Sequence, residues 1–342
     1  MKRGVVVLFR FLTTRANMNI PILKSPVEYA RALDAARMPH QAGYYAMYSS
    51  LLGAFVTDGA FMQAPLDDHV MHRGDGVFDT FKCLNGAAYN LDAHLARLMQ
   101  SAAGIGLAWP GGMADIRRLT LETLRVAGKP DCTCRVMLSR GPGGFGVSPY
   151  ESVAPGLYIV VFKLGKPFME LHPEGARVMR SSIPAKPGFW ASIKNCNYLP
   201  NVFMKREAVD NNADFALGYD DNGHLTEGAV ENAGIVTRQG VLVFPELKNI
   251  LAGTTMLRVM SLASELTGVI KGIEVRGITE AEVADAAELL LAGTTINVVA
   301  GCVYNGQPVG GGRPGPVYKI LQDALHADMT RNDAVRTPFG VR

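Results

Sequence analysis

Residues 182–201 read Ser182-Ile183-Pro184-Ala185-Lys186-Pro187-Gly188-Phe189-Trp190-Ala191-Ser192-Ile193-Lys194-Asn195-Cys196-Asn197-Tyr198-Leu199-Pro200-Asn201, and they place Lys194 among mostly apolar or uncharged residues. Most lysines are solvated, so the simplest interpretation is an exposed lysine at a strand-to-helix junction. Burial, however, lowers the pKa of a lysine, and a neutral amine is a nucleophile that bonds covalently to an aldehyde. The rest of the chain decides between these two interpretations.

The composition indicates a globular protein with a substantial core. The chain has 342 residues, which favours about two domains. Hydrophobic residues make up 48% and charged residues 19%, as in ordinary globular proteins. The net charge is only +3, and no run of lysine and arginine would follow a phosphate backbone. We therefore expect no nucleic-acid partner.

The cysteines and the N-terminus bear on location. Five cysteines are scattered, and Cys132-Thr133-Cys134 is not a metal-binding spacing, so we expect reduced thiols and no metal site. No apolar segment reaches the length of a membrane helix. Residues 1–12 are basic and apolar like a weak transit sequence, but Arg10 interrupts them and no cleavage pattern follows. We expect a cytoplasmic protein with a disordered head, and organellar import stays an alternative.

Local patterns predict an α+β protein. Asn85-Gly86 is the strongest hairpin signal in the chain. Period-3.6 apolar spacing predicts helices, and alternation between turn residues predicts strands. The helices are expected at about 25–40, from 92, at 112–127, at 202–208 and at 256–266, and the strands at 44–50, 54–57, 77–84, 87–91, 134–138, 156–163 and 215–219. We expect an N-terminal extension and helix over 1–40, a small domain over 41–165, a larger domain over 175–330 and a tail over 331–342.

Two Gly-Thr-Thr sequences are candidate phosphate sites. They are Gly253-Thr254-Thr255 and Gly293-Thr294-Thr295, and both lie at ends of apolar elements. Amides at a helix N-terminus favour anions, and threonine hydroxyls add donors. Each alone is weak, because threonine often serves only as a helix cap. Together with Lys194, an arginine and the carboxylate of Glu227, they are the groups needed to hold pyridoxal phosphate.

Several motifs resemble those of the fold-type IV pyridoxal-phosphate enzymes over nearly the whole chain. This family contains D-amino-acid aminotransferases, branched-chain aminotransferases and aminodeoxychorismate lyases, and the plant-type D-amino-acid transaminases are the most similar group. The matching stretches are Met47 to Ser50, Leu66 to Gly74, Gly76 to Thr80, Ser181 to Pro184 and Asn197 to Val202. The resemblance implies a two-domain α+β fold, pyridoxal 5′-phosphate as cofactor, and a homodimer.

The resemblance also implies roles for individual residues. Lys194 would bond to the cofactor aldehyde and move the proton of the substrate Cα. Glu227, in a Glu-Gly-x-x-x-Asn motif, would pair with the pyridine nitrogen. Tyr198 would lie near the ring oxygen, although the branched-chain enzymes place their tyrosine one residue further from the lysine. The expected phosphate-binding residues are Arg97, Thr254, Thr255, Thr294 and Thr295.

Two departures from the family bear on the substrate. Bacterial D-amino-acid enzymes hold the substrate carboxylate with an arginine and a histidine, and the corresponding positions here are Phe145 and Val147. Phe78-Asp79-Thr80 also differs from the Phe-Glu-Gly of branched-chain enzymes. We therefore expect Phe78 and Arg140 to contact the substrate, together with backbone amides near Gly293.

The expected function is transfer of an amino group between a small amino acid, favoured to be a D-amino acid, and a 2-keto acid. One alternative is a 4-amino-4-deoxychorismate lyase, which eliminates pyruvate to give 4-aminobenzoate on the same lysine and cofactor. A second is a branched-chain L-amino-acid aminotransferase. A degenerate fold without cofactor is the non-enzymatic alternative, and the presence of both Lys194 and Glu227 argues against it.

Overall fold

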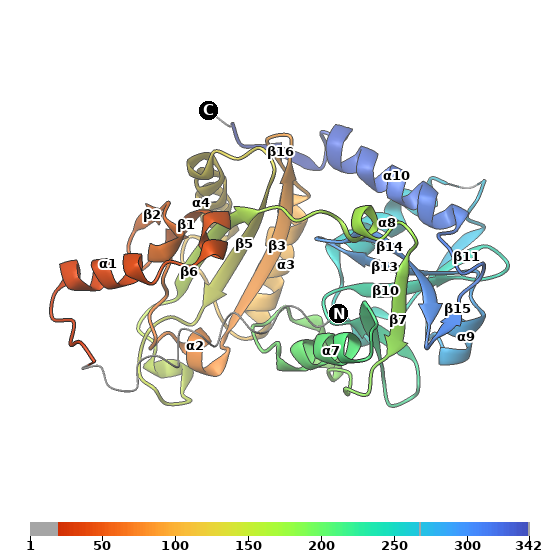
Figure 1. The fold of residues 1–342 in the computed structure, drawn as a ribbon, viewed down its shortest axis with the longest axis horizontal. Coiled ribbons are helices and arrows are strands. Elements are labelled where there is room, and N and C mark those ends of the chain that lie inside the picture. The colour runs from red at the N-terminus through yellow and green to blue at the C-terminus, as the bar shows by residue number, and fades with distance from the viewer. Residues whose placement is uncertain (1–19, 267, 341–342) are drawn as a thin grey trace.

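Two β-sheets, each with its own hydrophobic core, form the body of the molecule. The computed structural model describes residues 20–266 and 268–340, so the head expected over residues 1–17 lies outside them. Figure 1 shows the two sheets next to each other, with β7 to β15 in the second. Among the described residues, no helix is long and apolar enough to cross a membrane.

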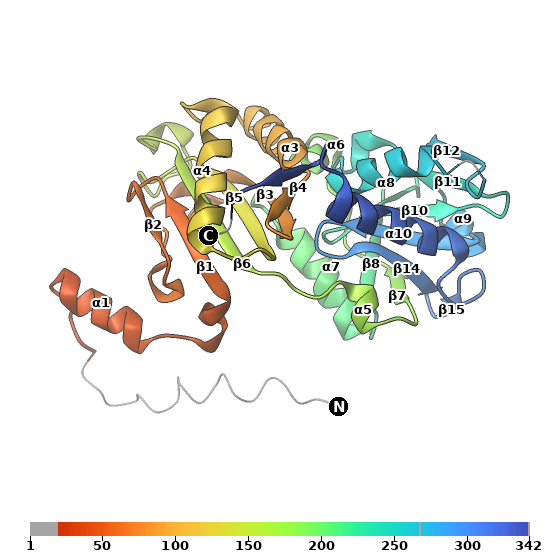
Figure 2. The same ribbon diagram turned by 90° about the horizontal axis from the view of Figure 1, so that it is seen from above.

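The first sheet has seven strands in the order β16-β4-β3-β5-β6-β1-β2, all of them antiparallel to their neighbours. Figure 2 shows α3 and α4 together on one face of this sheet. The elements are α1 (Pro26–Ala35), η2 (Pro39–Gly43), β1 (Tyr44–Ser49), β2 (Ala54–Val56), η3 (Gly59–Phe61), α2 (His69–Arg73), β3 (Gly76–Leu84), β4 (Ala87–Tyr89), α3 (Leu91–Gly104), α4 (Gly112–Ala127), β5 (Cys132–Ser139), η4 (Pro149–Glu151) and β6 (Gly156–Lys163).

Strand β3 is central to the site because its two faces have different partners. Successive side chains of a strand point to opposite faces. Val77, Phe81 and Cys83 are fully buried in the core that β3 shares with α3 and α4. Phe78 and Thr80, on the alternate positions, line a cavity instead. The hairpin after β3 forms as expected, with Asn85 and Gly86 both at positive φ (52° and 71°).

The second sheet contains nine strands, in the path β12-β11-β10-β13-β14-β7-β8-β9 with β15 on β14. Strand β9 also pairs with β10, so the strands from β10 to β9 along this path close into a ring. The elements that follow β6 along the chain are α5 (Phe168–Leu171), β7 (Ala176–Arg180), α6 (Gly188–Ser192), α7 (Leu199–Asp210), β8 (Phe215–Tyr219), β9 (Leu225–Gly228), β10 (Asn232–Val236), β11 (Val241–Phe244), η5 (Leu247–Asn249), α8 (Thr254–Ser264), β12 (Gly272–Val275), α9 (Glu280–Asp285), β13 (Glu288–Gly293), β14 (Asn297–Tyr304), β15 (Gln307–Pro308), α10 (Pro316–Arg331) and β16 (Arg336–Pro338).

The C-terminal residues, expected to be a tail, return to the first sheet. After α10, β16 pairs antiparallel with β4 and becomes an edge strand. Phe339, which follows it, is 1% exposed and belongs to the core of the first sheet. We propose that the two sheets are the centres of the two domains expected over 41–165 and 175–330, and that the C-terminal strand belongs to the first.

Candidate active site

A cavity of about 430 Å³ lies between the two sheets. The first sheet contributes residues of β3 and β5, and the second contributes the segment around Lys194, strand β9, the start of α8 and the β13–β14 turn. The lining includes all of the residues expected to bind the cofactor, together with Phe78: Arg97, Lys194, Tyr198, Glu227, Thr254, Thr255, Thr294 and Thr295.

Lys194 lies between α6 and α7, and its backbone is hydrogen-bonded to β3 and α3. The Phe78 amide donates to the Lys194 carbonyl (3.0 Å), and the Lys194 amide donates to Ser101 Oγ (3.1 Å). Its Nζ donates to the Tyr198 hydroxyl at 3.0 Å. Burial, assisted by the charge of Arg97, lowers the pKa of Lys194 to about 8. The lysine is therefore an amine that loses its proton near neutral pH.

Glu227 is held by backbone contacts at the end of β9. Its Oε2 accepts from the Leu251 amide at 3.0 Å, and Asn232 Nδ2 donates to the Leu251 carbonyl at 2.9 Å. Asn232 is the strand partner of Glu227, so the Glu-Gly-x-x-x-Asn spacing places both side chains on the loop before α8. Burial raises the pKa of Glu227 to about 7, although the Leu251 amide and nearby lysines oppose this. A cation at this carboxylate would restore its charge.

The first Gly-Thr-Thr sequence begins helix α8, as an anion site requires. Gly253 is the N-cap, and a Cβ on it would lie 1.8 Å from Asn232 Oδ1, so only glycine fits there. Thr254 and Thr255 are buried at the first helical positions. Arg97 reaches the same place, where its Nη1 donates to the Ala252 carbonyl at 3.3 Å. Amides at the start of a helix, two hydroxyls and a guanidinium suit a phosphate.

The second Gly-Thr-Thr sequence lies in a different structure. It connects β13 to β14 in a tight turn, with Gly293 opposite Asn297, rather than beginning a helix. Asn297 has a positive φ of 62°, and its side chain accepts a hydrogen bond from the buried amine of Lys82. Thr294 and Thr295 face the cavity from this turn, so their hydroxyls and amides are available there without a helix dipole.

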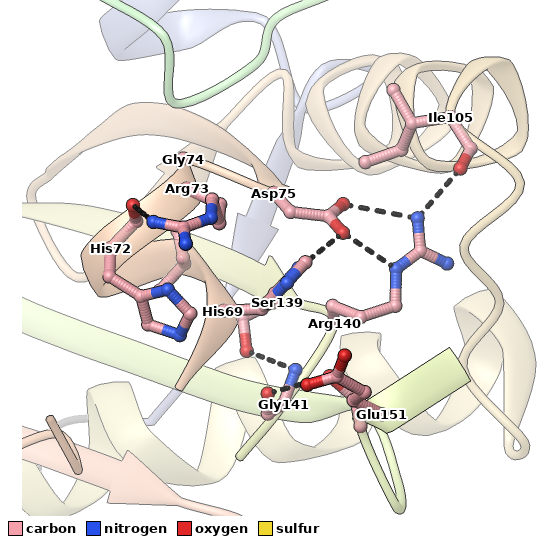
Figure 3. A network of polar contacts seen from close by, with 12 residues as sticks. His69, His72, Arg73, Gly74, Asp75, Ile105, Ser139, Arg140, Gly141 and Glu151 are labelled. Atoms are coloured by element: carbon pink, nitrogen blue, oxygen red, sulfur yellow. Dashed lines mark hydrogen bonds and ion pairs between the residues drawn. The ribbon is translucent and has the colours of Figure 1, made fainter. Parts of the chain in front are cut away.

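Arg140, the expected substrate contact, lies outside the lining of the cavity. Its Nε and Nη2 each donate to Asp75 at 3.0 Å, and its remaining donors reach the carbonyls of Ile105 and Gly106 at 2.8 Å. Figure 3 shows Asp75 held between His69 and Arg140. The guanidinium is therefore occupied by the protein itself, and it supports the loop before β3.

Another arginine, which we did not identify from sequence, lines the cavity in its place. Arg135 on β5 donates to Thr80 Oγ1 at 3.1 Å, and its guanidinium lies 5.1 Å from the centre of the Phe78 ring. Thr80 is its direct strand partner. The alternation of β5 could have identified it, because Cys134 and Val136 are core residues and Arg135 must face the other way.

Asp79 and His94 were also missed as parts of the site. Asp79 is fully buried and accepts from Arg97 Nε and Nη2, each at 2.8 Å, and from His94 Nδ1 at 2.7 Å. Burial opposes ionisation of Asp79, but His94 and Arg97 outweigh it and hold the pKa of this carboxyl well below its usual range. His94 and Arg97 lie three residues apart on α3, a helical spacing that places both on one face and was a usable signal.

These residues fit pyridoxal 5′-phosphate. A lysine with a lowered pKa, a carboxylate, and a helix N-terminus with an arginine line one cavity, and glycine is required at the cap because a side chain would meet Asn232. Lys194 can take an aldehyde, Glu227 a ring nitrogen and the start of α8 a phosphate. When bound, this cofactor supplies the aldehyde and an electron-withdrawing ring.

Comparison with known proteins decides the family. The model of the amino-transferase class IV family matches residues 76–302, which include the whole lining of the cavity. The chain belongs to the class IV aminotransferases. This aminotransferase is 38% identical over 314 residues to the chloroplastic D-amino-acid transaminase of Arabidopsis thaliana, covering 91% of this chain and 83% of that protein. It is 29% identical over 262 residues to the D-alanine aminotransferase of Bacillus licheniformis, covering 76% and 89%.

Solved structures agree on the fold of the aminotransferase. The T.th. branched-chain amino acid aminotransferase with pyridoxamine 5′-phosphate superposes with a TM-score of 0.80 at 26% identity, covering 87% of this chain and 99% of that one. The same enzyme with N-(5′-phosphopyridoxyl)-L-glutamate gives a TM-score of 0.79 at 25% identity and the same coverage. The expected fold type IV, the pyridoxal-phosphate cofactor and the aminotransferase activity are confirmed.

The lowered pKa of Lys194 predicts how cofactor attachment depends on pH. Only the neutral amine attacks an aldehyde, so the attachment rate of the cofactor-free protein should rise about tenfold per pH unit below pH 8 and level off above it. Stopped-flow absorbance after mixing with pyridoxal phosphate, at pH 6 to 10, measures this rate. A rate that still rises between pH 9 and pH 10 would show an ordinary lysine instead.

Proposed function

We propose that this aminotransferase moves the amino group of a small D-amino acid to a 2-keto acid, with Lys194 as its catalytic residue. The support for Lys194 is its position: its amine donates to the Tyr198 hydroxyl at 3.0 Å and has a pKa of about 8, in a cavity that also holds Glu227 and the start of α8. Such an amine can take the proton from the substrate Cα as a general base and donate it again as a general acid.

The other residues orient the reacting groups. Glu227 would keep a proton on the ring nitrogen of the cofactor, because a buried carboxylate is most stable beside a cation. Tyr198 accepts from the Lys194 amine and stacks edge-on against Phe78, with ring centroids 5.1 Å apart. Arg97 and the amides of Thr254 and Thr255 would bind the phosphate, and Thr294 and Thr295 line the same cavity.

We assign the substrate carboxylate to Arg135. Within the described residues this arginine makes no ion pair, whereas Arg97 and Arg140 are each bound to an aspartate. Arg135 lies against Phe78, close to the aromatic pair that touches Lys194. Phe145 and Val147, at the positions of the bacterial arginine–histidine pair, are outside the cavity lining and 62% and 79% exposed. The D-preference itself rests on the Arabidopsis and Bacillus relatives, whose names state D-amino-acid activity.

The donor assay tests this assignment. D-alanine, L-leucine and 4-amino-4-deoxychorismate are each supplied with and without 2-oxoglutarate, and keto-acid formation is followed. We expect acceptor-dependent pyruvate from D-alanine at the highest rate. Pyruvate from aminodeoxychorismate without acceptor, and no transfer from either amino acid, would identify the lyase. Fast transfer from L-leucine alone would identify a branched-chain L-amino-acid enzyme.

We also propose that the protein is a homodimer. The loops around residues 66–71 and 145–153 lie together, since His69 Nε2 lies 3.4 Å from the Gly146 carbonyl oxygen. They expose an unusual number of apolar side chains, which a second copy would cover: Leu66, Met71, Phe145, Val147, Tyr150 and Val153. Light scattering on the eluted protein gives the mass, and a mass of one chain would exclude the dimer.

A cytoplasmic location is likewise a proposal. The Arabidopsis relative is named as chloroplastic, and import through the first residues is the alternative. The comparison of a fluorescent fusion of the full chain with one that begins at Met18 distinguishes the two locations.

A further inference from the structure

A buried histidine connects the phosphate end of the cavity to Asp79. His94 is 2% exposed, and its Nδ1 lies 2.7 Å from Asp79 Oδ1. On the other side of the ring, Nε2 lies 3.3 Å from Thr254 Oγ1, at the first position of α8. The three side chains come from β3, α3 and α8, so the contact exists only in the folded chain.

The hydrogen bonds decide where the protons are before a phosphate binds. Asp79 is ionised and can only accept, so His94 Nδ1 carries a hydrogen. Burial lowers the pKa of His94, although Asp79 acts in the opposite sense. A neutral imidazole with its hydrogen on Nδ1 must accept at Nε2. The Thr254 hydroxyl therefore donates to His94, and its hydrogen is directed away from an anion at the start of α8.

A bound phosphate changes the charge balance around this ring. Arg97 is already paired with Asp79 through two nitrogens, so its charge is largely compensated inside the protein. A phosphate monoester adds about 1.5 to 2 negative charges at pH 7. The groups facing His94 are Asp79 from β3, Arg97 from its own helix, Lys194 from the segment between α6 and α7, and the uncharged Thr254 and Phe81. A second negative group beside these favours a positive imidazole.

We propose that His94 takes up one proton when the cofactor phosphate binds at the start of α8, and that this proton reverses the hydrogen bond to Thr254. The inference rests on the phosphate site proposed above. The proton comes from solvent and binds to Nε2, which then donates to Thr254 Oγ1. The Thr254 hydroxyl hydrogen turns toward the phosphate, and no covalent bond other than N–H forms or breaks. His94 is thus a positioning residue: its protonation frees the hydrogen of the Thr254 hydroxyl, which can then donate to the cofactor phosphate.

Nuclear magnetic resonance of the unmodified protein tests the protonation state directly. Histidine labelled with ¹⁵N is observed at pH 8 in the full chain with and without pyridoxal phosphate, and the signals of His94 are assigned by their loss in His94→Gln. We expect two protonated ring nitrogens in the loaded protein and one in the cofactor-free protein. A neutral His94 ring in the loaded protein would overturn the proposal.

Calorimetry with inorganic sulfate counts the protons without cofactor chemistry. Sulfate is a tetrahedral dianion that does not titrate in this pH range and does not react with Lys194. Its binding to the cofactor-free chain is measured at pH 8 in buffers of different ionisation enthalpy, for the wild type, His94→Gln and His326→Gln. Glutamine can still donate to Asp79 and accept from Thr254, and His326 is an exposed histidine on α10 that controls for the loss of an imidazole.

The wild type and His326→Gln should take up nearly one proton more than His94→Gln. Between the pKa of His94 in the free chain and its pKa in the sulfate-bound chain, their sulfate affinity should also fall more steeply with pH than that of His94→Gln, by about a further tenfold per pH unit. Effects of Lys194 on sulfate are common to all three proteins and cancel. If pyridoxal phosphate displaces the sulfate, but the wild type and His94→Gln take up equal numbers of protons, the role of His94 alone would be overturned. Sulfate that pyridoxal phosphate does not displace would overturn the phosphate site as well.

Discussion

Lys194→Ala is expected to lose the covalent cofactor link and to reduce turnover by about a thousandfold or more. Alanine removes the amine that bonds to the aldehyde and also the base that moves the Cα proton, and acid–base catalysis alone commonly contributes about 10²- to 10⁴-fold. The environment of the amine supports this size of effect, because burial holds its pKa near 8 and Tyr198 accepts its hydrogen at 3.0 Å.

Borohydride reduction followed by peptide mapping measures the link, and initial rates with D-alanine measure turnover. Lys186→Ala is the matched control, since Lys186 also lines the cavity, lies 4.7 Å from the centre of the Tyr198 ring and has a pKa lowered by burial. We expect this control to keep the link. A reduced adduct on Lys186 in the wild type would move the covalent role away from Lys194.

Glu227→Gln is expected to bind the cofactor but to turn over at least about tenfold more slowly. A neutral amide does not keep a proton on the ring nitrogen, so the ring withdraws electrons less strongly from Cα. A hydrogen bond to a charged group contributes about 1.5–3 kcal/mol, and about 1.4 kcal/mol corresponds to tenfold. We expect this because the buried carboxyl of Glu227 has a raised pKa, and a cationic partner such as a protonated ring nitrogen would stabilise its charged form.

Glu231→Gln is the matched control for this change. Glu231 lines the same cavity, belongs to the same motif, and burial likewise raises its pKa to about 7. Like Glu227, it accepts a hydrogen bond from a backbone amide, that of Val230 at 2.9 Å. Single-turnover and steady-state rates of both variants, at saturating cofactor, separate the two carboxylates. A Glu227→Gln enzyme as fast as the wild type, or a larger loss in Glu231→Gln, would remove the assigned role of Glu227.

Glu227→Gln should also change how the stability of the cofactor-free protein depends on pH. The folded pKa of Glu227 is raised above its ordinary value of 4.5 to about 7, so the folded state holds the proton more tightly than the unfolded state does. Its contribution to stability is therefore present at low pH and is lost as pH rises from 4.5 through 7. Denaturant unfolding should show this loss, on the order of 3 kcal/mol, reduced in Glu227→Gln.

Much of this protein was determined by local sequence. The Asn85-Gly86 hairpin forms because both residues accept positive φ, and α4 (Gly112–Ala127) follows its 3.6-residue spacing. The Lys194 segment was recognisable because a lysine in an apolar stretch conflicts with the ordinary exposure of lysine. The Glu-Gly-x-x-x-Asn spacing located Glu227, and the structure explains it, since Glu227 and Asn232 are strand partners.

Only the tertiary structure decided which charged groups meet in the cavity. Arg135 and Arg140 are five residues apart and alike by sequence, but they are separated by what faces them: Asp75 occupies Arg140, whereas Arg135 extends from β5 into the cavity. Asp79 and His94 acquire their protonation states from burial and from Arg97, which sequence does not report. The physical reason is that a strand or helix pattern specifies a residue's own face, while its charge, its partners and its access to a ligand depend on distant segments folded against that face.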